Sequence, residues 1–126
     1  MLKLTAAELL AAVCDPLLPI LDLSPMRQIF GDIGEEVREL LQLFLDSTQP
    51  LVEELDKALA ADDVLAAREA AHSAKGAGNS AGAFRFAKLC GDAESACARG
   101  DVEAAIQLLE PVRKAFAEVS AAVAEV

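Results

Sequence analysis

The side chains best suited to chemistry gather in one short run, His72-Ser73-Ala74-Lys75-Gly76. His72 is the only histidine of the chain, so a metal site would lack a second imidazole. No nucleophile with an orienting acid accompanies His72 in the pattern of an acyl-transfer triad. A neutral imidazole can itself be a nucleophile, and phosphoryl transfer asks mainly for in-line positioning and charge neutralisation. The run therefore indicates phosphoryl chemistry at His72.

Lys75 and Gly76 follow His72 at the spacing of one helical turn. On a shared helix face, the Lys75 ammonium can reach a phosphoryl group on His72. It should also favour the unprotonated imidazole, because two neighbouring cations repel. Gly76 removes a side chain that would crowd the approach of another protein. Since glycine inside a helix costs about 0.5 to 1 kcal/mol relative to alanine, its presence indicates a close approach.

The helix that carries this run has two unlike faces. One face bears polar side chains and the glycine, namely Arg68, Glu69, His72, Lys75, Gly76 and Asn79. The other face bears small apolar side chains, namely Ala67, Ala70, Ala71, Ala74, Ala77 and Ala81. We therefore expect His72 to be exposed and held by a closely packed scaffold.

The chain reads as helices and helix breakers, without the two-residue alternation of a strand. The expected helices run from Thr5 to about Cys14, from Ser24 (as a cap before Pro25) to Gly31, from Gly34 to about Ala60, from Asp62 or Asp63 to about Ser80, from Ala83 to Arg99, and from Asp101 onward. Pro50 should kink its helix or break it in two, and Pro111 should kink the last helix.

Apolar residues recur every three or four positions along these helices, as one buried stripe requires. The stripe expected in the long helix is Val37, Leu40, Leu41, Phe44, Leu45, Leu51, Val52, Leu55 and Leu59. The stripe expected in the last helix is Val102, Ile106, Leu109, Val112, Phe116, Val119 and Val123. Inward positions between them are Phe86, Cys90, Ala93 and Cys97, and we expect Met26, Ile29 and Phe30 in the core rather than in a docking patch.

The expected fold is all-α, an antiparallel up-and-down four-helix bundle with short additional N-terminal helices. We expect a single domain over residues 1–126, with an N-terminal helix and irregular segment at 1–24 and the bundle at 25–126.

Composition removes several classes of function. The chain has 126 residues, 21 of them acidic and 11 basic, for a net charge of −10, which disfavours nucleic acid as a partner. Mean hydropathy is +0.34, but no apolar stretch reaches the roughly 18 to 20 residues that span a membrane. Glu8 and Asp15 interrupt the leucine-rich start, so we do not expect export.

The cysteines Cys14, Cys90 and Cys97 lack a CxxC pair and are expected to be buried, reduced thiols of a cytoplasmic protein, without a metal site.

The site residues also resemble the signature of a known family. The run from His72 to Gly76, followed by Gly82-Ala83, Phe86, Cys90 and Glu94, resembles that of histidine phosphotransfer (HPt) domains, in which H-x-x-K-G precedes a Gly-Ala pair, a Cys and an acidic residue. The likeness covers roughly residues 20 to 100. Ala74 and Ala93 depart from it, since leucine is common at both positions in the family.

The resemblance implies a phosphorelay intermediate and not a turnover enzyme. His72 would accept a phosphoryl group from the phosphoaspartate of a response-regulator receiver domain or of a hybrid sensor histidine kinase, and pass it to another receiver. Lys75 would neutralise the phosphoryl oxygens, and partner contacts would involve Arg68, Gly76, Asn79 and Lys88. We expect no cofactor on this chain, because Mg²⁺ would belong to the receiver, and we expect a monomer that binds neither membrane nor nucleic acid.

One alternative from another class stays open. A non-catalytic helical adaptor would share the fold, the charge and the docking face, yet bind a receiver or kinase without phosphotransfer. The two hypotheses differ at His72. A hydrolase is disfavoured, since the sequence shows neither a positioned acid-base pair nor a pocket for one.

Overall fold

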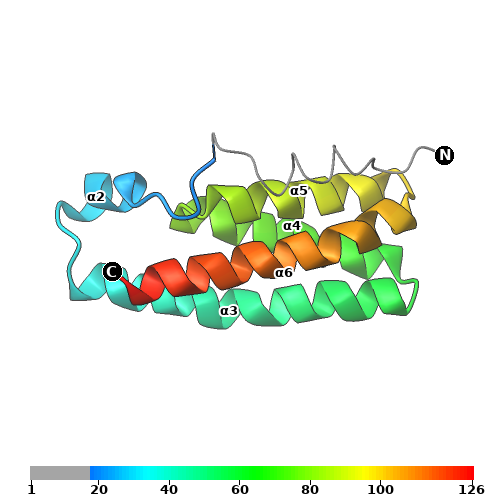
Figure 1. Ribbon diagram of the computed structural model, residues 1–126, viewed down its shortest axis with the longest axis horizontal. Coiled ribbons are helices and arrows are strands. Elements are labelled where there is room, and N and C mark those ends of the chain that lie inside the picture. The colour runs from blue at the N-terminus through cyan, green and yellow to red at the C-terminus, as the bar shows by residue number, and fades with distance from the viewer. Residues whose placement is uncertain (1–17) are drawn as a thin grey trace.

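The computed structural model describes residues 18–126, and this part of the chain is helical without strands. Its helices are α2 (Ser24–Phe30), α3 (Glu35–Ala60), α4 (Val64–Ala81), α5 (Phe84–Ala98) and α6 (Val102–Ala124) (Figure 1). The all-α prediction is confirmed. The helix expected from Thr5 to Cys14 lies outside the described residues.

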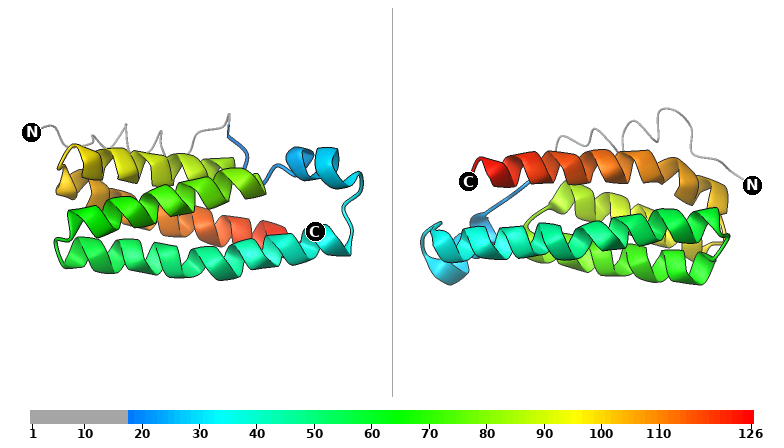
Figure 2. Two further views of the ribbon diagram at one scale, coloured as in Figure 1. Left: turned by 180° about the vertical axis from the view of Figure 1, so that it is seen from behind. Right: turned by 90° about the horizontal axis from the view of Figure 1, so that it is seen from below.

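Helices α3 to α6 form an antiparallel bundle in which each helix packs against the next, and α6 closes the ring against α3 (Figures 1 and 2). Connections of two or three residues force consecutive helices to run in opposite directions. The short helix α2 lies at the end of the bundle where α3 begins and α6 ends. None of the described helices is both long and apolar enough to cross a membrane.

Small side chains set the spacing of the helix that carries the predicted site. The buried face of α4 consists of alanines and one glycine, namely Ala67, Ala70, Ala71, Ala74, Gly78 and Ala81. A Cβ atom at Gly78 would lie 3.0 Å from the Phe86 ring and 3.1 Å from the Cβ of Ala87, both on α5. The approach of α4 to α5 therefore depends on a glycine at this point.

Three aromatic rings join the other helices of the core. Phe86 of α5 lies with its ring centroid 5.4 Å from that of Phe116 on α6 and 6.4 Å from that of Phe44 on α3. These separations fall in the usual range for packed aromatic pairs. The rings thus connect α3, α5 and α6, while the buried face of α4 carries no aromatic side chain.

The helix caps expected before α4 and α6 are confirmed. Asp63 caps α4 by accepting a hydrogen bond from the Ala66 amide at 3.1 Å. Asp101 caps α6 by accepting one from the Ala104 amide at 3.2 Å. Of the two aspartates proposed for the first cap, Asp63 is the one that serves, while Asp62 occupies the turn with a φ of +56°.

The start of α2 differs from the prediction. Ser24 is the first helical residue and not the cap, a position that Leu23 occupies without a capping side chain. The Ser24 amide instead donates to Oδ1 of Asp22 at 2.9 Å. Hydrogen bonds from the side chain and the backbone of Ser24 lower the pKa of the Asp22 carboxyl. The side-chain acceptor at the start of α2 is therefore Asp22, two positions before Ser24.

Pro50 and Pro111 lie inside helices that continue through them. Of the two outcomes expected at Pro50, a kink or a break of the helix in two, the break does not occur, because α3 runs without interruption from Glu35 to Ala60. Pro50 and Asp46 are exposed, and water can therefore serve the Asp46 carbonyl that lacks its usual amide partner. Helix α6 also continues through Pro111, which is buried in the core.

Several large apolar residues that were expected in the core are exposed. In α6 the side chain of Ile106 is 47% exposed, because alanines build much of the inner face and shift the buried stripe: Ala104, Ala105, Leu108, Pro111, Val112, Ala115 and Val119. Leu40 of α3 is also exposed. Ile29 and Phe30 are exposed because α2 lies at the end of the bundle, where no helix covers them, while Met26 packs partly against the core.

Residues 18–23 form a strap across the α4–α5 turn. The Asp22 amide donates to the Gly82 carbonyl at 2.8 Å, and the Arg85 amide donates to the Pro19 carbonyl at 3.2 Å. The Arg85 side chain adds a hydrogen bond to the Leu18 carbonyl at 3.0 Å. Gly82 ends α4 with a φ of +85°, and a Cβ atom there would lie 2.0 Å from the Asp22 carbonyl oxygen. The strap therefore requires glycine at this position.

We predict that Gly82→Ala destabilises the protein more than Gly100→Ala. Gly100 also has a positive φ, +74°, but a Cβ atom there would meet nothing within 4 Å. Gly100→Ala should therefore lower the free energy of unfolding by about 1 kcal/mol, from backbone strain alone. Gly82→Ala should lower it by about 2 to 3 kcal/mol, because it also displaces the strap and its hydrogen bonds. Urea denaturation of both variants measures the difference, and equal losses would contradict a close approach by the strap.

Candidate functional site

His72 projects from the middle of α4, and its side chain is 67% exposed. Ala70, Ala71 and Ala74 on the opposite face are buried against the bundle. The exposure expected from the polar face of this helix is thus confirmed. A short, tightly packed helix segment holds the imidazole at a fixed height above the surface.

One carboxylate from α5 contacts both chemically active side chains of α4. Oε2 of Glu94 lies 2.8 Å from Nδ1 of His72, and Oε1 of Glu94 lies 2.7 Å from Nζ of Lys75. The Glu94 side chain is only 19% exposed, whereas that of His72 is largely in solvent. His72, Lys75 and Glu94 therefore form a single cluster across the α4–α5 interface.

The charge of Glu94 determines which ring nitrogen of His72 is free. The hydrogen bond from Lys75 lowers the pKa of the Glu94 carboxyl most, partial burial raises it, and the hydrogen bond with His72 lowers it further. An ionised carboxylate can only accept hydrogen bonds, so Nδ1 of His72 must carry a hydrogen and donate the hydrogen bond. In the neutral imidazole Nε2 then bears the lone pair, and no described residue bonds to Nε2.

The effect expected of Lys75 on the protonation of His72 stays a prediction. What the structure adds is a carboxylate, because the two oxygens of Glu94 contact the imidazole and the ammonium.

The predicted partner residues fall at different places around this cluster. Arg68 lines the same shallow depression as His72, together with Leu65, Glu69, Ser73 and Glu94. Gly76 is exposed, and a Cβ atom there would meet nothing within 4 Å, so the surface one turn beyond His72 is open.

Asn79 and Lys88 lie further from the imidazole. Asn79 is exposed about 10 Å along α4 from His72, near the end of that helix. Lys88 precedes Glu94 by six positions on α5, and it pairs with Asp92 at 3.0 Å and not with the cluster.

Glu94 is the functional residue that the sequence did not place at the site. In the sequence Glu94 belongs to the family signature, but it lies 22 positions from His72 and on another helix. A usable signal was present, because Glu94 follows the turn at Gly82 at about the same distance as His72 precedes it. In an antiparallel helical hairpin, such residues lie level with each other.

The cysteines of the described chain take no part in the site. Cys90 and Cys97 are buried and unpaired, as expected. Burial raises the pKa of the Cys90 thiol to about 12, and burial also raises that of Cys97. Such thiols remain protonated and unreactive at neutral pH. Within residues 18–126, His, Cys, Asp and Glu side chains form no cluster that could hold a metal ion.

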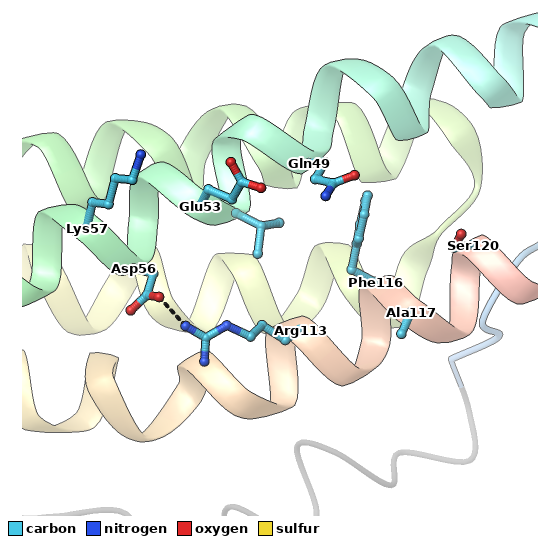
Figure 3. A pocket seen from close by; sticks show the side chains of 9 residues that line it. Gln49, Glu53, Asp56, Lys57, Arg113, Phe116, Ala117 and Ser120 are labelled. Carbon is cyan, nitrogen blue, oxygen red and sulfur yellow. Dashed lines mark hydrogen bonds and ion pairs between the residues drawn. The ribbon is translucent and has the colours of Figure 1, made fainter.

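A separate pocket lies between α3 and α6 (Figure 3). Val52 and Phe116 provide its apolar surface, and an ion pair between Asp56 and Arg113 crosses one end. None of the predicted site residues lines it. The pocket is therefore distinct from the cluster on α4 and α5.

Comparisons with known proteins agree on one family. The family model described as Hpt domain matches residues 39–122. Among solved structures, the chain is similar to the crystal structure of histidine-containing phosphotransfer protein B from Pseudomonas aeruginosa. The two share 30% sequence identity with a TM-score of 0.77, over 85% of this chain and 93% of that chain. A comparison with curated proteins gave no match.

We predict that Lys75→Met raises the pKa of Glu94, because it removes the hydrogen bond that lowers this pKa most. A carboxyl pKa that is lower in the folded state than in the unfolded state stabilises the protein at any pH above the unfolded-state pKa. This stabilisation is lost as the pH falls through the folded-state pKa. The stability difference between wild type and Lys75→Met should therefore shrink on acidification. Carboxyl ¹³C NMR titration and denaturation at several pH values measure both effects.

Lys88→Met is the matched control, because Lys88 is a lysine on α5 that pairs with Asp92 instead of Glu94. Its Glu94 titration should equal that of wild type. The same rise in both variants would show that the pKa of Glu94 follows the overall charge and not the contact with Lys75.

Proposed function

The chain belongs to the Hpt domain family, and from this premise we propose that His72 is the residue that carries a phosphoryl group between proteins. The donor is the phosphoaspartate of a response-regulator receiver domain or of a hybrid sensor histidine kinase, and the acceptor is an aspartate of another receiver. Members of this family are phosphoryl carriers, and His72 is the only histidine available to this chain.

The contact between Nδ1 of His72 and Glu94 is the observation that carries the proposal. It leaves the lone pair of Nε2 directed to solvent, where a phosphorylated partner can approach. That lone pair forms the new P–N bond while the bond from phosphorus to the aspartate oxygen breaks, and the electron pair returns to the aspartate carboxylate. The proton on Nδ1 stays in place throughout.

Glu94 also stabilises the product of this step. A phosphorylated imidazole that keeps its Nδ1 proton carries a positive charge, and the adjacent carboxylate offsets it. In the onward step, a carboxylate oxygen of the next receiver attacks phosphorus, the P–N bond breaks, and a neutral imidazole leaves. Because no proton has to move, the same residues support transfer in either direction.

Lys75 is proposed to neutralise the phosphoryl oxygens once they are near His72. It lies one turn along the same face, and its ammonium is already at the cluster through Glu94. Arg68 supplies a second cation in the same depression, and the open surface at Gly76 admits the partner's backbone. Asn79 and Lys88 are proposed as contacts at the edge of the interface, with Mg²⁺ contributed by the receiver.

A non-catalytic adaptor is the second candidate. It would bind a receiver through the same face, but it would have no need for a carboxylate that fixes one tautomer of an exposed imidazole. This arrangement favours the carrier.

We predict that a phosphorylated receiver labels the wild-type protein with an acid-labile, alkali-stable phosphate, and that His72→Gln abolishes the label. The substitution should leave the fold intact, because exposed side chains contribute little to stability. Ser73→Ala, in the same depression, is the matched control and should keep the label. A label retained by His72→Gln, or absent from wild type with every receiver of the source cell, would favour the adaptor.

We further predict that Glu94→Gln slows transfer by about tenfold at saturating receiver. The glutamine amide oxygen can still accept a hydrogen bond from Nδ1, but glutamine lacks the charge that offsets the phosphorylated imidazole, and charge-assisted hydrogen bonds are about twice as strong as neutral ones. Rapid-quench measurement of the labelled fraction gives the rate. Asp92→Asn removes a nearby carboxylate of α5 that pairs with Lys88 and should transfer normally. Equal slowing in both variants would argue against a specific role of Glu94.

A further inference from the structure

Gly91 of α5 lies directly beneath the side chain of Lys75. A Cβ atom at Gly91 would lie 3.1 Å from Cδ of Lys75 and 3.9 Å from its Cγ. Outside the local backbone of α5, it would meet no other atom within 4 Å. A side chain at this position would therefore disturb Lys75 before any other residue.

The far end of Lys75 is fixed one turn further along α5. Its Nζ lies 2.7 Å from Oε1 of Glu94, which follows Gly91 by three positions. The aliphatic stem thus leaves α4, crosses α5 at Gly91, and ends at Glu94. Both the path and the end point of this long side chain lie on the neighbouring helix.

The backbone of α5 gives no reason for a glycine at this position. Gly91 is helical, and it is absent from the described glycines with positive φ, which are Gly31, Gly82 and Gly100. Glycine in a helix interior is less stable than alanine. Gly78 has an evident purpose, since Phe86 and Ala87 pack against it, and at Gly91 the corresponding neighbour is Lys75 alone.

We infer that Gly91 is a positioning residue for phosphotransfer, because its lack of a side chain lets Lys75 cross α5 and hold its ammonium beside His72. This inference rests on the proposed functions of His72 and Lys75. Gly91 itself contacts neither the imidazole nor the phosphoryl group. It acts by leaving room for the Lys75 side chain to cross α5.

Two substitutions at Gly91 should displace the Lys75 side chain to different extents. In Gly91→Ala the stem of Lys75 must shift by a few tenths of an ångström, and transfer at saturating receiver should slow by about two- to threefold. In Gly91→Leu a larger side chain fills the crossing point, and transfer should slow by about tenfold. The pKa of Glu94 should rise in the same order, because Lys75 supplies the main interaction that lowers it.

Stability separates this role from a structural one. Gly91→Ala should raise the melting temperature or leave it unchanged, because alanine favours the helix, even though transfer slows. Ser95→Leu is the matched control, since it adds leucine to an exposed position of α5 one turn beyond Gly91. It should transfer at the wild-type rate when the receiver is saturating.

A double-substitution cycle with Lys75→Ala decides whether Gly91 acts through the lysine. Gly91→Leu should add no further slowing in the Lys75→Ala background. Additive losses, equal slowing by Ser95→Leu, or an unchanged rate together with an unchanged Glu94 titration would each overturn the inference. If wild type acquires no phosphate on His72, the proposed function fails instead, and the Glu94 titration still reports whether Gly91 places Lys75.

Discussion

A single carboxylate shared between two helices is the interaction on which the site depends. Glu94 of α5 accepts a hydrogen bond from Nδ1 of His72 with one oxygen and binds the Lys75 ammonium with the other. This requires α4 and α5 to approach closely at a fixed register, which the alanine face of α4 and the contact of Gly78 with Phe86 provide. The small residues of the core are thus a condition for the polar chemistry on the surface.

The exposure of this cluster suits a reaction whose other half arrives on a partner protein. Ion pairs near the surface are weak, since water and salt screen them. The bond between Lys75 and Glu94 can therefore be exchanged for one between Lys75 and an incoming phosphoryl group at small cost. A deeply buried pair would hold the lysine too firmly, because separating buried charges is strongly unfavourable. A rigid scaffold with an exchangeable surface cluster thus suits the proposed transfer of a phosphoryl group between proteins.

Much of this arrangement could be predicted from the sequence, because it depends on local signals. Capping aspartates placed the starts of α4 and α6, and the periodicity of α4 placed His72, Lys75 and Gly76 on one face. The role of Glu94 could not be read in this way, since it depends on the rotation and register of two helices. The exposure of Ile106 was missed because alanines, which give a weak hydrophobic signal, build the inner face of α6. At Pro50 the sequence left a kink and a break open, because a proline removes one hydrogen bond of the helix without determining whether the helix continues.

The strap over the α4–α5 turn has a consequence for the order in which the chain folds. The hydrogen bond between Arg85 and Leu18 joins residues 67 positions apart, whereas that between His72 and Glu94 joins residues 22 positions apart. Closing the longer loop costs more chain entropy and is slower. We therefore expect the helical hairpin that bears the imidazole to assemble early as a local nucleus. The strap would fasten across its turn only afterwards, as a late closing event.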